Sequence, residues 1–506
     1  MTRPQTTDPG APIPGRLREV SEAFFVVTSL SRRSGGLTRA ILQRVRLLDA
    51  QGIRTTVLVL KHAHAEDVER VALRLRRTLP RRTKVRYFWR EGAALFPGDL
   101  GRVDPAGVTR RTVRNRLRRV QRVESLDTAG RVVAVEHRSL RGTRVAVDRT
   151  DAADGGAVRH HVSGARTWMS VREHLHPLRA RAVVAESVGP RETTLAAAQG
   201  RWVAEVLGRA ERVPVLFVDG TDACLLPTTL PAGVARVVST LHNPHTVRPW
   251  TPRDPSEPHW DAVLRRTGAI TRVVVLTRAQ QADVLARYGE PAPTVVNNCV
   301  VGAVRPIVST EPRLAVVGRL TRQKRVDHAI RAFATVAAQV PAARLDVVGE
   351  GSRRDALVRL AAELGVAGQV VFHGFRPDAH EILGRARAGV LSSWHEGMPL
   401  VLLEAMQAGT PYVAYDVAYG PGEIIRHGVD GLLVPPGDVD ALGRAMLSVL
   451  RDAGLAARLG AAAQEVGERF SPERYAQEWL GVYREEVAEA LLEGGAPEAR
   501  RTGGRS

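Results

Sequence analysis

The chain has 506 residues, a hydrophobic content of 44% and a formal net charge of +20. This length predicts two or more domains, and the hydrophobic content is sufficient for proper cores. The excess of Lys and Arg (73) over Asp and Glu (53) favours anionic partners: a phosphate polymer, an anionic lipid or a nucleic acid.

The composition also excludes several kinds of protein. No apolar run approaches the roughly 18 residues of a membrane span, and residues 1–15 lack the apolar core of a signal peptide. No Cys/His spacing typical of a metal site occurs, and Cys224 and Cys299, each beside an apolar run, are expected to be buried free thiols. We therefore expect a cytoplasmic protein without a metal, with peripheral contact at the inner face of the membrane left open.

The first elements, after a disordered tail over 1–19, form a β–loop–α–β unit. We expect a strand, a helix and a strand over 23–27, 38–51 and 55–60. Gly35 and Gly36 precede the helix, where the backbone of such a unit comes close to a ligand. A flexible loop is the alternative for this Gly-Gly pair.

The α/β alternation is lost after a helix over 66–79 and a strand over 84–89. From about 90 to 178, short alternating runs separated by turn clusters predict an antiparallel β insertion. It contains a basic run over 110–122, in which Arg114, Arg118 and Arg119 are candidate acceptor-binding residues. A solvated basic face is the alternative.

The alternation then returns and predicts the remainder of a doubly wound domain. The expected strands lie over 182–185, 213–219, 235–242 and 270–277, and the expected helices over 193–210 and 278–288. A stretch with two prolines, 302–313, is the expected linker to a second domain of the same kind.

The second half repeats the α/β pattern without a sequence repeat. Its expected strands lie over 313–320, 343–348, 370–374, 389–391, 412–415 and 431–434, and its expected helices over 327–340, 352–364, 379–386, 399–408, 438–451 and 455–466. A final helix over 471–492 is expected to cross back to the first domain, before a disordered tail over 493–506. We therefore predict an α/β chain with two Rossmann-like domains, 20–305 and 306–470, whose strand ends face a cleft.

The most informative stretch, 389–438, is a strand, a polar turn, a helix and a strand. Glu396 lies in the turn and Glu404 eight positions later in the helix. At about 1.5 Å and about 100° per residue, helical geometry separates the two by roughly 12 Å. That is too far for an acid/base couple on one bond and suits one long ligand held at two points. Two solvated glutamates are the alternative.

The start of that helix is a predicted anion site. Free backbone N–H groups lie near Gly397, Met398 and Leu400, with Pro399 as the first helical residue. A ligand with hydroxyl-rich ends and a negative middle, such as a nucleotide-sugar, fits this arrangement.

Arg319 and Lys324 follow the first strand of the second domain and can supply two charges to one diphosphate. An Arg can bind it bidentately and a Lys as a point charge, which would replace a divalent metal. Surface solvation is the alternative for both side chains.

The segments GRLTRQKRVDHAI, VVGEGSRRDAL, FHGF, SSWHEGMPLVLLEAMQAGTPYVAYDV and DGLLVPPGD together resemble retaining glycosyltransferases of family 4, which have the GT-B fold. The resemblance implies a nucleotide-diphospho-sugar donor, no further cofactor, and metal-independent transfer with retained configuration. It assigns Glu396 to the donor sugar, Glu404 to the ribose, and Arg319 and Lys324 to the diphosphate. His242 resembles the family's sugar-contacting histidine.

Two sets of residues follow from these arguments. The expected catalytic residues are Glu396, His242, Arg319 and Lys324. The expected donor-binding residues are Gly35, Gly36, Arg319, Lys324, Gly349, Glu350, Gly374, Phe375, Glu396, Gly397, Met398, Pro399, Leu400 and Glu404. His245 competes with His242 and is also a candidate acceptor contact. No carboxylate is an obvious nucleophile, so front-face substitution and a covalent intermediate both stay open.

A narrower resemblance rests on SGGLT, LHNPH and above all YDVAYGP. These look like poly(glycerol-phosphate) α-glucosyltransferases of wall teichoic acid decoration, whose close relatives glycosylate serine-rich adhesins. It implies transfer of a hexose from UDP-glucose or UDP-N-acetylglucosamine to a hydroxyl of a polyol-phosphate polymer or its lipid-linked precursor. It also implies acceptor binding and self-association through the β insertion.

Two alternatives stay open for the function. One is glycosyl transfer to Ser/Thr of a protein or to another glycan. The other, suggested by charge alone, is a protein that binds nucleic acid or another polyanion. Aromatic residues for base stacking are scarce, at 5% of the chain, so nucleic acid is not expected as a partner.

Overall fold

The structure is a computed structural model. It describes residues 15–27, 36–60, 79–96, 99–100, 109–114, 120–129, 131–138, 144–150, 157–163, 166–172, 181–186, 189–248, 253–266, 268–300 and 311–494. The chain divides into two compact units. The first comprises Met1–Thr240, Pro258–Val273 and Trp479–Ser506, and the second comprises Leu241–Glu257 and Val274–Glu478. The predicted domain boundary at 305/306 stays a prediction.

A seven-stranded sheet has the order β15-β14-β13-β12-β1-β2-β3. Its strands are β1 (Ser21–Val27), β2 (Arg54–Val59), β3 (Lys84–Tyr87), β12 (Val213–Asp219), β13 (Arg236–Leu241), β14 (Ile270–Val275) and β15 (Thr294–Val295). Every residue of β1 is buried, and β1 pairs in parallel with β2 and β12. A strand buried on both faces belongs in the middle of a parallel sheet.

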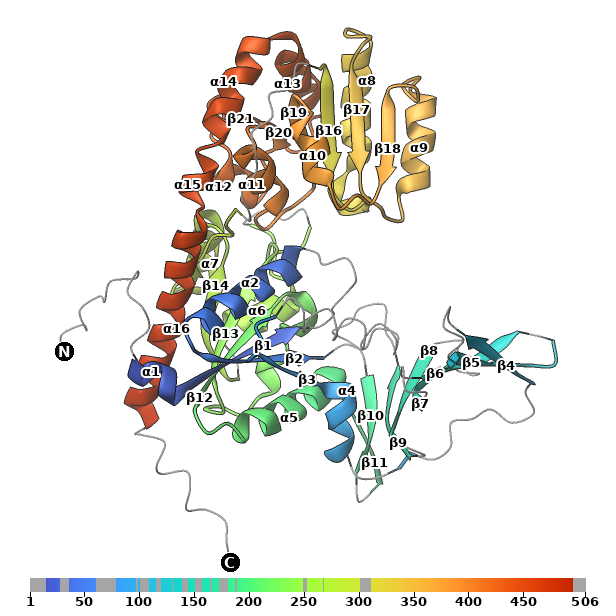
Figure 1. Cartoon of the computed structure of the whole chain (residues 1–506), viewed down its shortest axis with the longest axis vertical. Helices are drawn as coiled ribbons and strands as arrows, with labels where there is room; N and C mark the ends of the chain where they lie inside the picture. The colour runs from blue at the N-terminus through green and yellow to red at the C-terminus, as the bar shows by residue number, and fades with distance from the viewer. Residues whose placement is uncertain are drawn as a thin grey trace, which may run out of the picture. The chain divides into compact units, whose positions relative to one another are not determined.

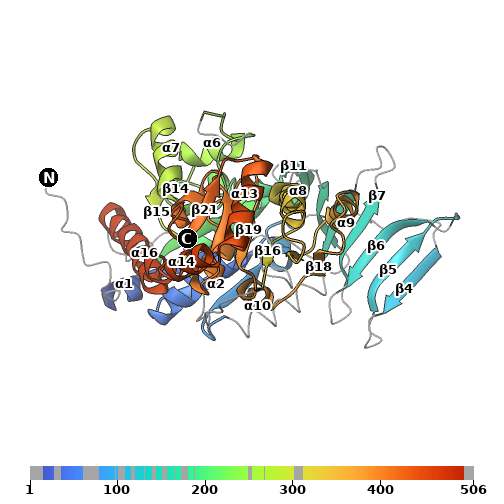
Figure 2. The same cartoon turned by 90° about the horizontal axis from the view of Figure 1, so that it is seen from above.

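The predicted β insertion is confirmed as an eight-stranded sheet of order β11-β10-β9-β8-β7-β6-β5-β4 (Figure 2). Its strands, paired antiparallel throughout, are β4 (Thr109–Arg114), β5 (Val120–Leu126), β6 (Val132–Arg138), β7 (Arg144–Thr150), β8 (Ala157–Ser163), β9 (Arg166–Arg172), β10 (Arg181–Glu186) and β11 (Gly189–Thr194). The sheet therefore continues to Thr194, beyond the predicted end of the insertion.

The strand predicted over 182–185 was assigned to the wrong sheet. It is β10, which pairs antiparallel with β9 and β11. A short apolar run is typical of a buried strand in either kind of sheet, so periodicity alone does not choose between them. The next helix, α5 (Leu195–Gly208), begins where the Thr194 side chain accepts a hydrogen bond from the Ala197 N–H.

The second unit contains a six-stranded parallel sheet of order β18-β17-β16-β19-β20-β21 (Figure 1). Its strands are β16 (Arg313–Val317), β17 (Arg344–Val348), β18 (Val370–Gly374), β19 (Ala388–Leu391), β20 (Tyr412–Tyr415) and β21 (Gly431–Val434). The strand order reverses between β16 and β19. In an open α/β sheet such a reversal marks the place where ligands bind.

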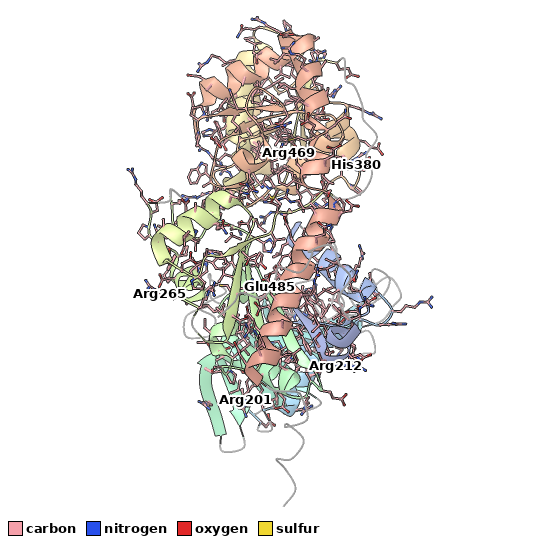
Figure 3. The ribbon with its side chains drawn as sticks, turned by 90° about the vertical axis from the view of Figure 1, so that its left-hand side faces the viewer. Arg201, Arg212, Arg265, His380, Arg469 and Glu485 are labelled. Carbon is pink, nitrogen blue, oxygen red and sulfur yellow. The ribbon has the colours of Figure 1, made fainter. Side chains whose placement is uncertain are left out.

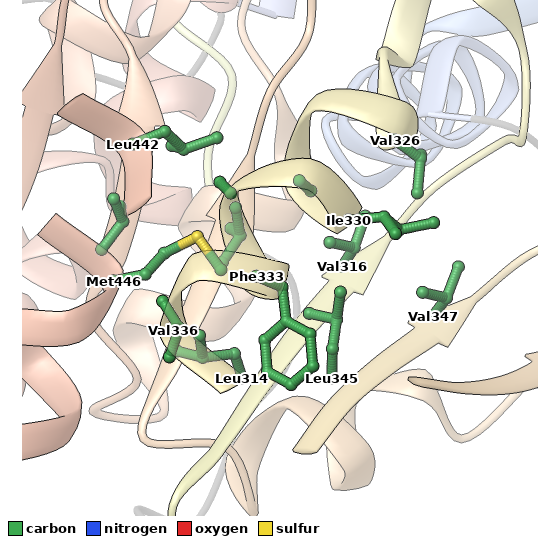
Figure 4. Packing of buried hydrophobic residues seen from close by; sticks show 14 of the residues in the cluster. Leu314, Val316, Val326, Ile330, Phe333, Val336, Leu345, Val347, Leu442 and Met446 are labelled. Atoms are coloured by element: carbon green, nitrogen blue, oxygen red, sulfur yellow. The ribbon is translucent and has the colours of Figure 1, made fainter. Parts of the chain in front are cut away.

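Two hydrophobic clusters hold this sheet together. In the first, Phe333 of α8 and Met446 of α13 pack with strand residues such as Leu314 and Leu345 (Figure 4). The second contains Leu403 of α11 and other residues from α10, α11 and α12. Helices on both faces leave the loops at the strand ends to carry polar chemistry.

The helices confirm the predicted alternation. Those of the second unit are α7 (Arg278–Tyr288), α8 (Val326–Ala337), α9 (Arg354–Glu363), α10 (Ala379–Gly384), α11 (Leu400–Gln407), α12 (Gly420–Ile424), α13 (Val439–Arg451), α14 (Ala453–Ala463) and α15 (Val466–Arg469). Those before it are α1 (Gly15–Val20), α2 (Gly36–Ala50), α4 (Phe88–Glu91), α5 and α6 (Pro258–Leu264), and α16 (Pro472–Gly494) ends the described chain.

Three predicted boundaries change. The end of the predicted N-terminal tail forms α1, where the Arg18 carbonyl accepts a hydrogen bond of 2.7 Å from Arg212. The strand predicted over 84–89 ends at Tyr87, where α4 begins. Pro399 is extended (φ −72°, ψ 112°) and caps α11 instead of starting it. Residues 66–78 of the predicted helix over 66–79, residues 302–310 of the linker, and residues 1–14 and 495–506 of the tails lie outside the described residues.

Helix α16 carries a buried carboxylate in the first unit. Glu486 is fully buried and accepts hydrogen bonds from Arg236 (2.9 Å), Arg272 (2.5 Å) and the Thr271 hydroxyl (2.7 Å). Its neighbour Glu485, labelled in Figure 3, is largely exposed and also pairs with Arg272, at 2.8 Å. Cys224 and Cys299 are buried thiols that form no disulfide within the described residues, as predicted. Within the described residues, no helix combines the length and the apolar character needed to cross a membrane.

Candidate functional site

The loops that follow β16 and β19 are joined at the reversal of the strand order. The Trp394 backbone N–H donates to the Gln323 carbonyl (2.8 Å), and the Gln323 side chain donates to the His395 carbonyl (3.1 Å). The Ser392 hydroxyl donates to the Arg325 carbonyl (2.8 Å). These bonds fix the polar turn after β19 against the loop that carries the predicted basic residues.

Lys324 and Glu396 meet at the centre of this loop pair. The Lys324 Nζ lies 2.5 Å from the Glu396 Oε1, and the two side chains are 18% and 8% exposed. The turn that holds Glu396 is fixed by a second loop: its N–H donates to the Ala418 carbonyl (3.2 Å), and its carbonyl accepts from the Tyr419 N–H (2.8 Å). Since Glu396 lies before α11, the helical spacing predicted between Glu396 and Glu404 does not apply.

The glycine-rich loops after β16, β17 and β18 are tied to one another. The Leu320 N–H donates to the Glu350 carbonyl, and the Gly349 N–H donates to the Gly374 carbonyl, both at 2.8 Å. Gly349 has φ +140°, and a Cβ there would lie 1.9 Å from the Gly318 carbonyl oxygen. Only glycine permits that approach. The structure thus places Gly349, Glu350 and Gly374 on loops bonded to the one that carries Arg319.

The two ends of this loop set are exposed. Arg319 is exposed, and in the part of the chain that the structure describes no carboxylate pairs with its guanidinium. Phe375 is 46% exposed. A cation and an aromatic ring are therefore available to solvent beside the buried Lys324–Glu396 pair.

The predicted His242 joins the same site through its backbone. A Cβ on Gly397 would lie 1.9 Å from the His242 carbonyl oxygen, so the two segments touch only because position 397 is glycine. The fully buried Gln280 donates from its side chain to the Asn243 carbonyl (2.9 Å) and holds this segment in place. His242 follows the last residue of β13, Leu241, and is half-buried.

His245 is not available to an acceptor, contrary to the prediction. Its imidazole is fully buried and stacks on the Tyr419 ring, with centroids 6.2 Å apart and planes 5° apart. Among the described residues, neither ring nitrogen has a hydrogen-bond partner. Burial, and then the charge of Arg287, lowers the His245 pKa to about 4. The ring therefore stays neutral and braces the segment of His242 against the loop that holds Glu396.

The residues around the start of α11 divide into two groups. Met398 and Pro399 are buried, and the Met398 carbonyl accepts a hydrogen bond from the Asn298 side chain (2.9 Å). Leu400 and Glu404 are half-buried. Burial, and then the charge of Glu404, raises the pKa of the Tyr412 hydroxyl. Met398 and Pro399 can thus contribute only backbone to a ligand, whereas Glu404 can contribute its carboxylate.

Two arginines lie beside the site that were not predicted from the sequence. The guanidinium carbons of Arg248 and Arg325 lie 3.9 Å and 5.0 Å from the centre of the Trp394 ring. Burial lowers the pKa of His395 to about 4, with Glu396 opposing and Lys324 and Arg248 adding to the effect. Trp394 in a polar turn was a visible signal, but nothing in the sequence connects it with Arg248, about 150 residues earlier.

Other predicted residues are placed only in part. Gly35, Arg118 and Arg119 lie outside the described residues, as does the side chain of Arg114 on β4. Gly36 begins α2. Elsewhere in the basic run, Arg111 and Arg122 both pair with Glu124, at 2.5 Å and 2.8 Å, which neutralises part of the predicted charge. No group of three or more His, Cys, Asp and Glu side chains suited to a metal ion occurs in the described segments.

Comparisons with known proteins show which family and which proteins the chain resembles. Residues 303–466 match the family described as glycosyl transferases group 1. The chain is 36% identical over 281 residues to the exopolysaccharide phosphotransferase SCO2592 of Streptomyces coelicolor, covering 53% of this chain and 29% of that protein. It is 26% identical over 223 residues to the poly(ribitol-phosphate) α-N-acetylglucosaminyltransferase of Staphylococcus aureus, covering 44% of this chain and 45% of that protein. The matches thus span less than half of either relative.

One solved structure establishes the fold. A variant of S. aureus TarM in complex with fondaparinux, α-GlcNAc-glycerol and UDP superposes with a TM-score of 0.73 at 18% identity, covering 92% of this chain and 99% of that chain. The chain therefore has the GT-B fold, as predicted, with the antiparallel sheet as an addition to it.

Proposed function

We propose that this protein is a retaining glycosyltransferase that moves a hexose from a UDP-sugar to a hydroxyl of a polyol-phosphate polymer. The relatives support this proposal: one is named for N-acetylglucosamine transfer to poly(ribitol phosphate), and the TarM structure holds UDP and α-GlcNAc-glycerol. UDP-glucose and UDP-N-acetylglucosamine are the two donors to test.

The observation that carries the proposal is the Lys324–Glu396 pair at the reversal of the strand order. An ammonium group has three N–H donors, and Glu396 Oε1, 2.5 Å away, accepts one of them. The remaining donors can reach a phosphate oxygen while Lys324 still orients Glu396. We assign the diphosphate to Lys324 and Arg319, the donor sugar to Glu396 and His242, and the ribose to Glu404.

The chemistry follows from where charge develops. The bond between C1 of the sugar and the β-phosphate oxygen breaks, a bond from C1 to the acceptor oxygen forms, and the proton of the acceptor hydroxyl is released to solvent. UDP leaves with increased negative charge, which Arg319 and Lys324 stabilise. Fixed cations aimed at such a charge are commonly worth a factor of about 10² to 10³ in rate. Retention of configuration and independence of metal ions stay predictions.

A second candidate function rests on the Streptomyces coelicolor relative, which is named a phosphotransferase. Such an enzyme would transfer the sugar together with its phosphate and release UMP. Transfer of the sugar alone releases UDP. Glycosylation of protein Ser/Thr or of another glycan also releases UDP and differs only in the acceptor.

The nucleotide product therefore decides between the two reactions. Purified full-length protein is incubated with each UDP-sugar and with poly(glycerol phosphate), poly(ribitol phosphate) or a Ser-rich peptide. We expect UDP release and a polymer heavier by one hexose per transfer, detected by mass spectrometry. UMP release would replace the proposal with phosphosugar transfer, and transfer to the peptide alone would replace the acceptor. Addition of EDTA tests independence of metal ions, and the anomeric NMR signal of the product tests retention.

Two further expectations are proposals with their own measurements. Sedimentation of the chain with anionic vesicles tests peripheral membrane contact. Analytical ultracentrifugation, with a form lacking the antiparallel sheet as the comparison, tests self-association through it.

A further inference from the structure

Arg248 and Arg325 gather on the indole of Trp394 beside the Lys324–Glu396 pair, and the proposed donor chemistry uses neither arginine. Arg325 directly follows Lys324, and Trp394 precedes Glu396 by two positions. The backbone bond from Trp394 to Gln323 (2.8 Å) keeps the indole next to this loop. The guanidinium carbons lie 3.9 Å and 5.0 Å from the ring centre, within the range of cation–π attraction.

The partners of the Arg325 guanidinium are electrically neutral. It donates a hydrogen bond to Nε2 of His328, which must be unprotonated to accept it. The Nδ1 of His328 then carries the proton and donates to the hydroxyl of Tyr415, 2.9 Å away. In the described part of the chain, no carboxylate lies within ion-pair distance of Arg325. The hydrogen bonds from Arg325 to His328 and from His328 to Tyr415 therefore orient the arginine without cancelling its charge.

The surroundings keep these partners neutral. Burial, and then the positive charge of Arg325, lowers the pKa of His328. Burial raises the pKa of Tyr415, which is fully buried, to about 12. Burial also lowers the pKa of Arg325 itself, and the charge of Asp327, which forms no ion pair with it in the described residues, only partly opposes this shift. An anionic ligand would supply the missing charge in a charge-assisted hydrogen bond.

The backbone conformation of Arg325 also supports a ligand-binding role. Its φ of 43° and ψ of 45° are left-handed, a conformation that costs an L-residue about 1 kcal/mol or more. Asn or Gly would adopt it with less strain, yet an arginine occupies the position. Such strain clusters at ligand-binding sites, where the surrounding structure holds it. The hydrogen bond from Ser392 to the Arg325 carbonyl (2.8 Å) is one contact that does so.

We propose that Arg248, Arg325 and Trp394 form a subsite for a phosphate group of the acceptor. This inference rests on the proposed function. A donor diphosphate is already matched by Arg319 and Lys324, so two additional guanidinium groups exceed what it needs. A polyol-phosphate chain carries a phosphate next to each hydroxyl that can receive the sugar. The subsite would hold that phosphate while the hydroxyl reaches the donor.

The test compares a charged with an uncharged acceptor. The kcat/KM values of Arg325→Gln and Arg248→Gln are measured with poly(glycerol phosphate) and with free glycerol. We expect at least a tenfold loss with the polymer and less than a twofold loss with glycerol. Arg359→Gln, which removes an exposed arginine on α9, is the matched control and should change neither value. Equal losses with both acceptors would overturn the subsite.

Two binding measurements separate this inference from the proposed function. The Kd of UDP should be unchanged in Arg325→Gln; a tenfold weaker Kd would assign Arg325 to the donor diphosphate and overturn the proposal. Glycerol 3-phosphate is then titrated calorimetrically into UDP-saturated protein, which needs no turnover. Binding that both variants lose supports the subsite even if the wild type fails to glycosylate the polymer, whereas binding that they retain excludes it. The circular dichroism spectrum checks that each variant is folded.

Discussion

Arg236 and Arg272 in the first unit and Arg325 in the second are all partly withdrawn from water, yet their surroundings are opposite. Arg236 and Arg272 share the buried carboxylate of Glu486. Burial acts against their charge, but hydrogen bonds to Glu486 outweigh it and raise both pKa values. Arg325 is held by a neutral imidazole and an indole, and burial lowers its pKa.

The difference separates the structural use of an arginine from the ligand-binding use proposed for Arg325. The glutamates of α16 that pair with Arg236 and Arg272 together neutralise both arginines and leave no charge for a ligand. An arginine oriented by neutral groups keeps its charge and still has a defined position. In a chain with a formal net charge of +20, the identity of the partner is more informative than the presence of an arginine.

The largest expected effect is on stability, from Glu486→Gln. This change removes the buried carboxylate that the two arginines share and leaves them only the exposed Glu485, Glu489 and Glu493. Breaking a buried ion pair typically costs about 3–5 kcal/mol. We expect a large fall in the free energy of unfolding measured in urea. The matched control is Glu485→Gln, since Glu485 is 60% exposed and its pair with Arg272 should be worth less than about 1 kcal/mol. Similar losses of unfolding free energy for both variants would contradict the structural role assigned to Glu486.

The next largest effect is expected from Lys324→Met, which changes the candidate site in the second unit. It removes the cation that pairs with Glu396 and that is proposed to bind the donor phosphates, so we expect a loss of about 10² to 10³ in turnover and weaker binding of UDP. Arg322→Met changes an exposed arginine in the same loop and should leave both quantities within twofold. Unchanged UDP affinity in Lys324→Met, measured by calorimetry, would contradict the assigned role.

His245→Phe tests the neutral imidazole that braces the site. Because the folded-state pKa is about 4 and the unfolded value about 6.5, the unfolded chain binds a proton first as the pH falls. His245 thus contributes stability that is present above about pH 6.5 and is lost towards pH 4. We expect the variant to lose less Tm than the wild type between pH 7 and pH 5.

The control for the pH experiment is His380→Gln, which changes an exposed histidine of α10 labelled in Figure 3. It should reproduce the wild-type difference in Tm. If His245→Phe loses as much Tm between pH 7 and pH 5 as the wild type does, the imidazole of His245 is not the cause of the pH dependence.

The smallest expected effect is that of Tyr415→Phe, which removes the hydroxyl bonded to His328 and keeps the ring. Losing one such bond commonly costs about 1 kcal/mol, so we expect a several-fold fall in kcat/KM with the polymer acceptor. In the double variant with Arg325→Gln, the second change should add nothing, because Tyr415 acts through Arg325. Additive losses would show that the two residues are independent.

Much of the second unit could be predicted from the sequence. Its strands alternate with helices, and the apolar runs are short enough for a parallel sheet. Lys324 and Glu396 were both predicted as candidate site residues, since each follows a strand and such loops meet at one edge of the sheet, and their side chains do meet. The sequence could not assign the run over 182–185 to a sheet, because a strand in either sheet needs the same apolar residues.

The sequence by itself determined which residues are proposed to carry the chemistry of the second unit: two cations and Glu396 on loops that follow strands, and Glu404 in the next helix. Only the tertiary structure decided how they are used. It buried His245 against Tyr419, fixed the turn of Glu396 against a second loop, and brought Arg248 to Trp394 from a distant part of the chain. These outcomes depend on packing and on the loss of solvation that comes with it, and neither is encoded by the spacing of residues along one segment. The Lys324–Glu396 pair is visible from local sequence, whereas the neutral surroundings of Arg325 exist only in the folded protein.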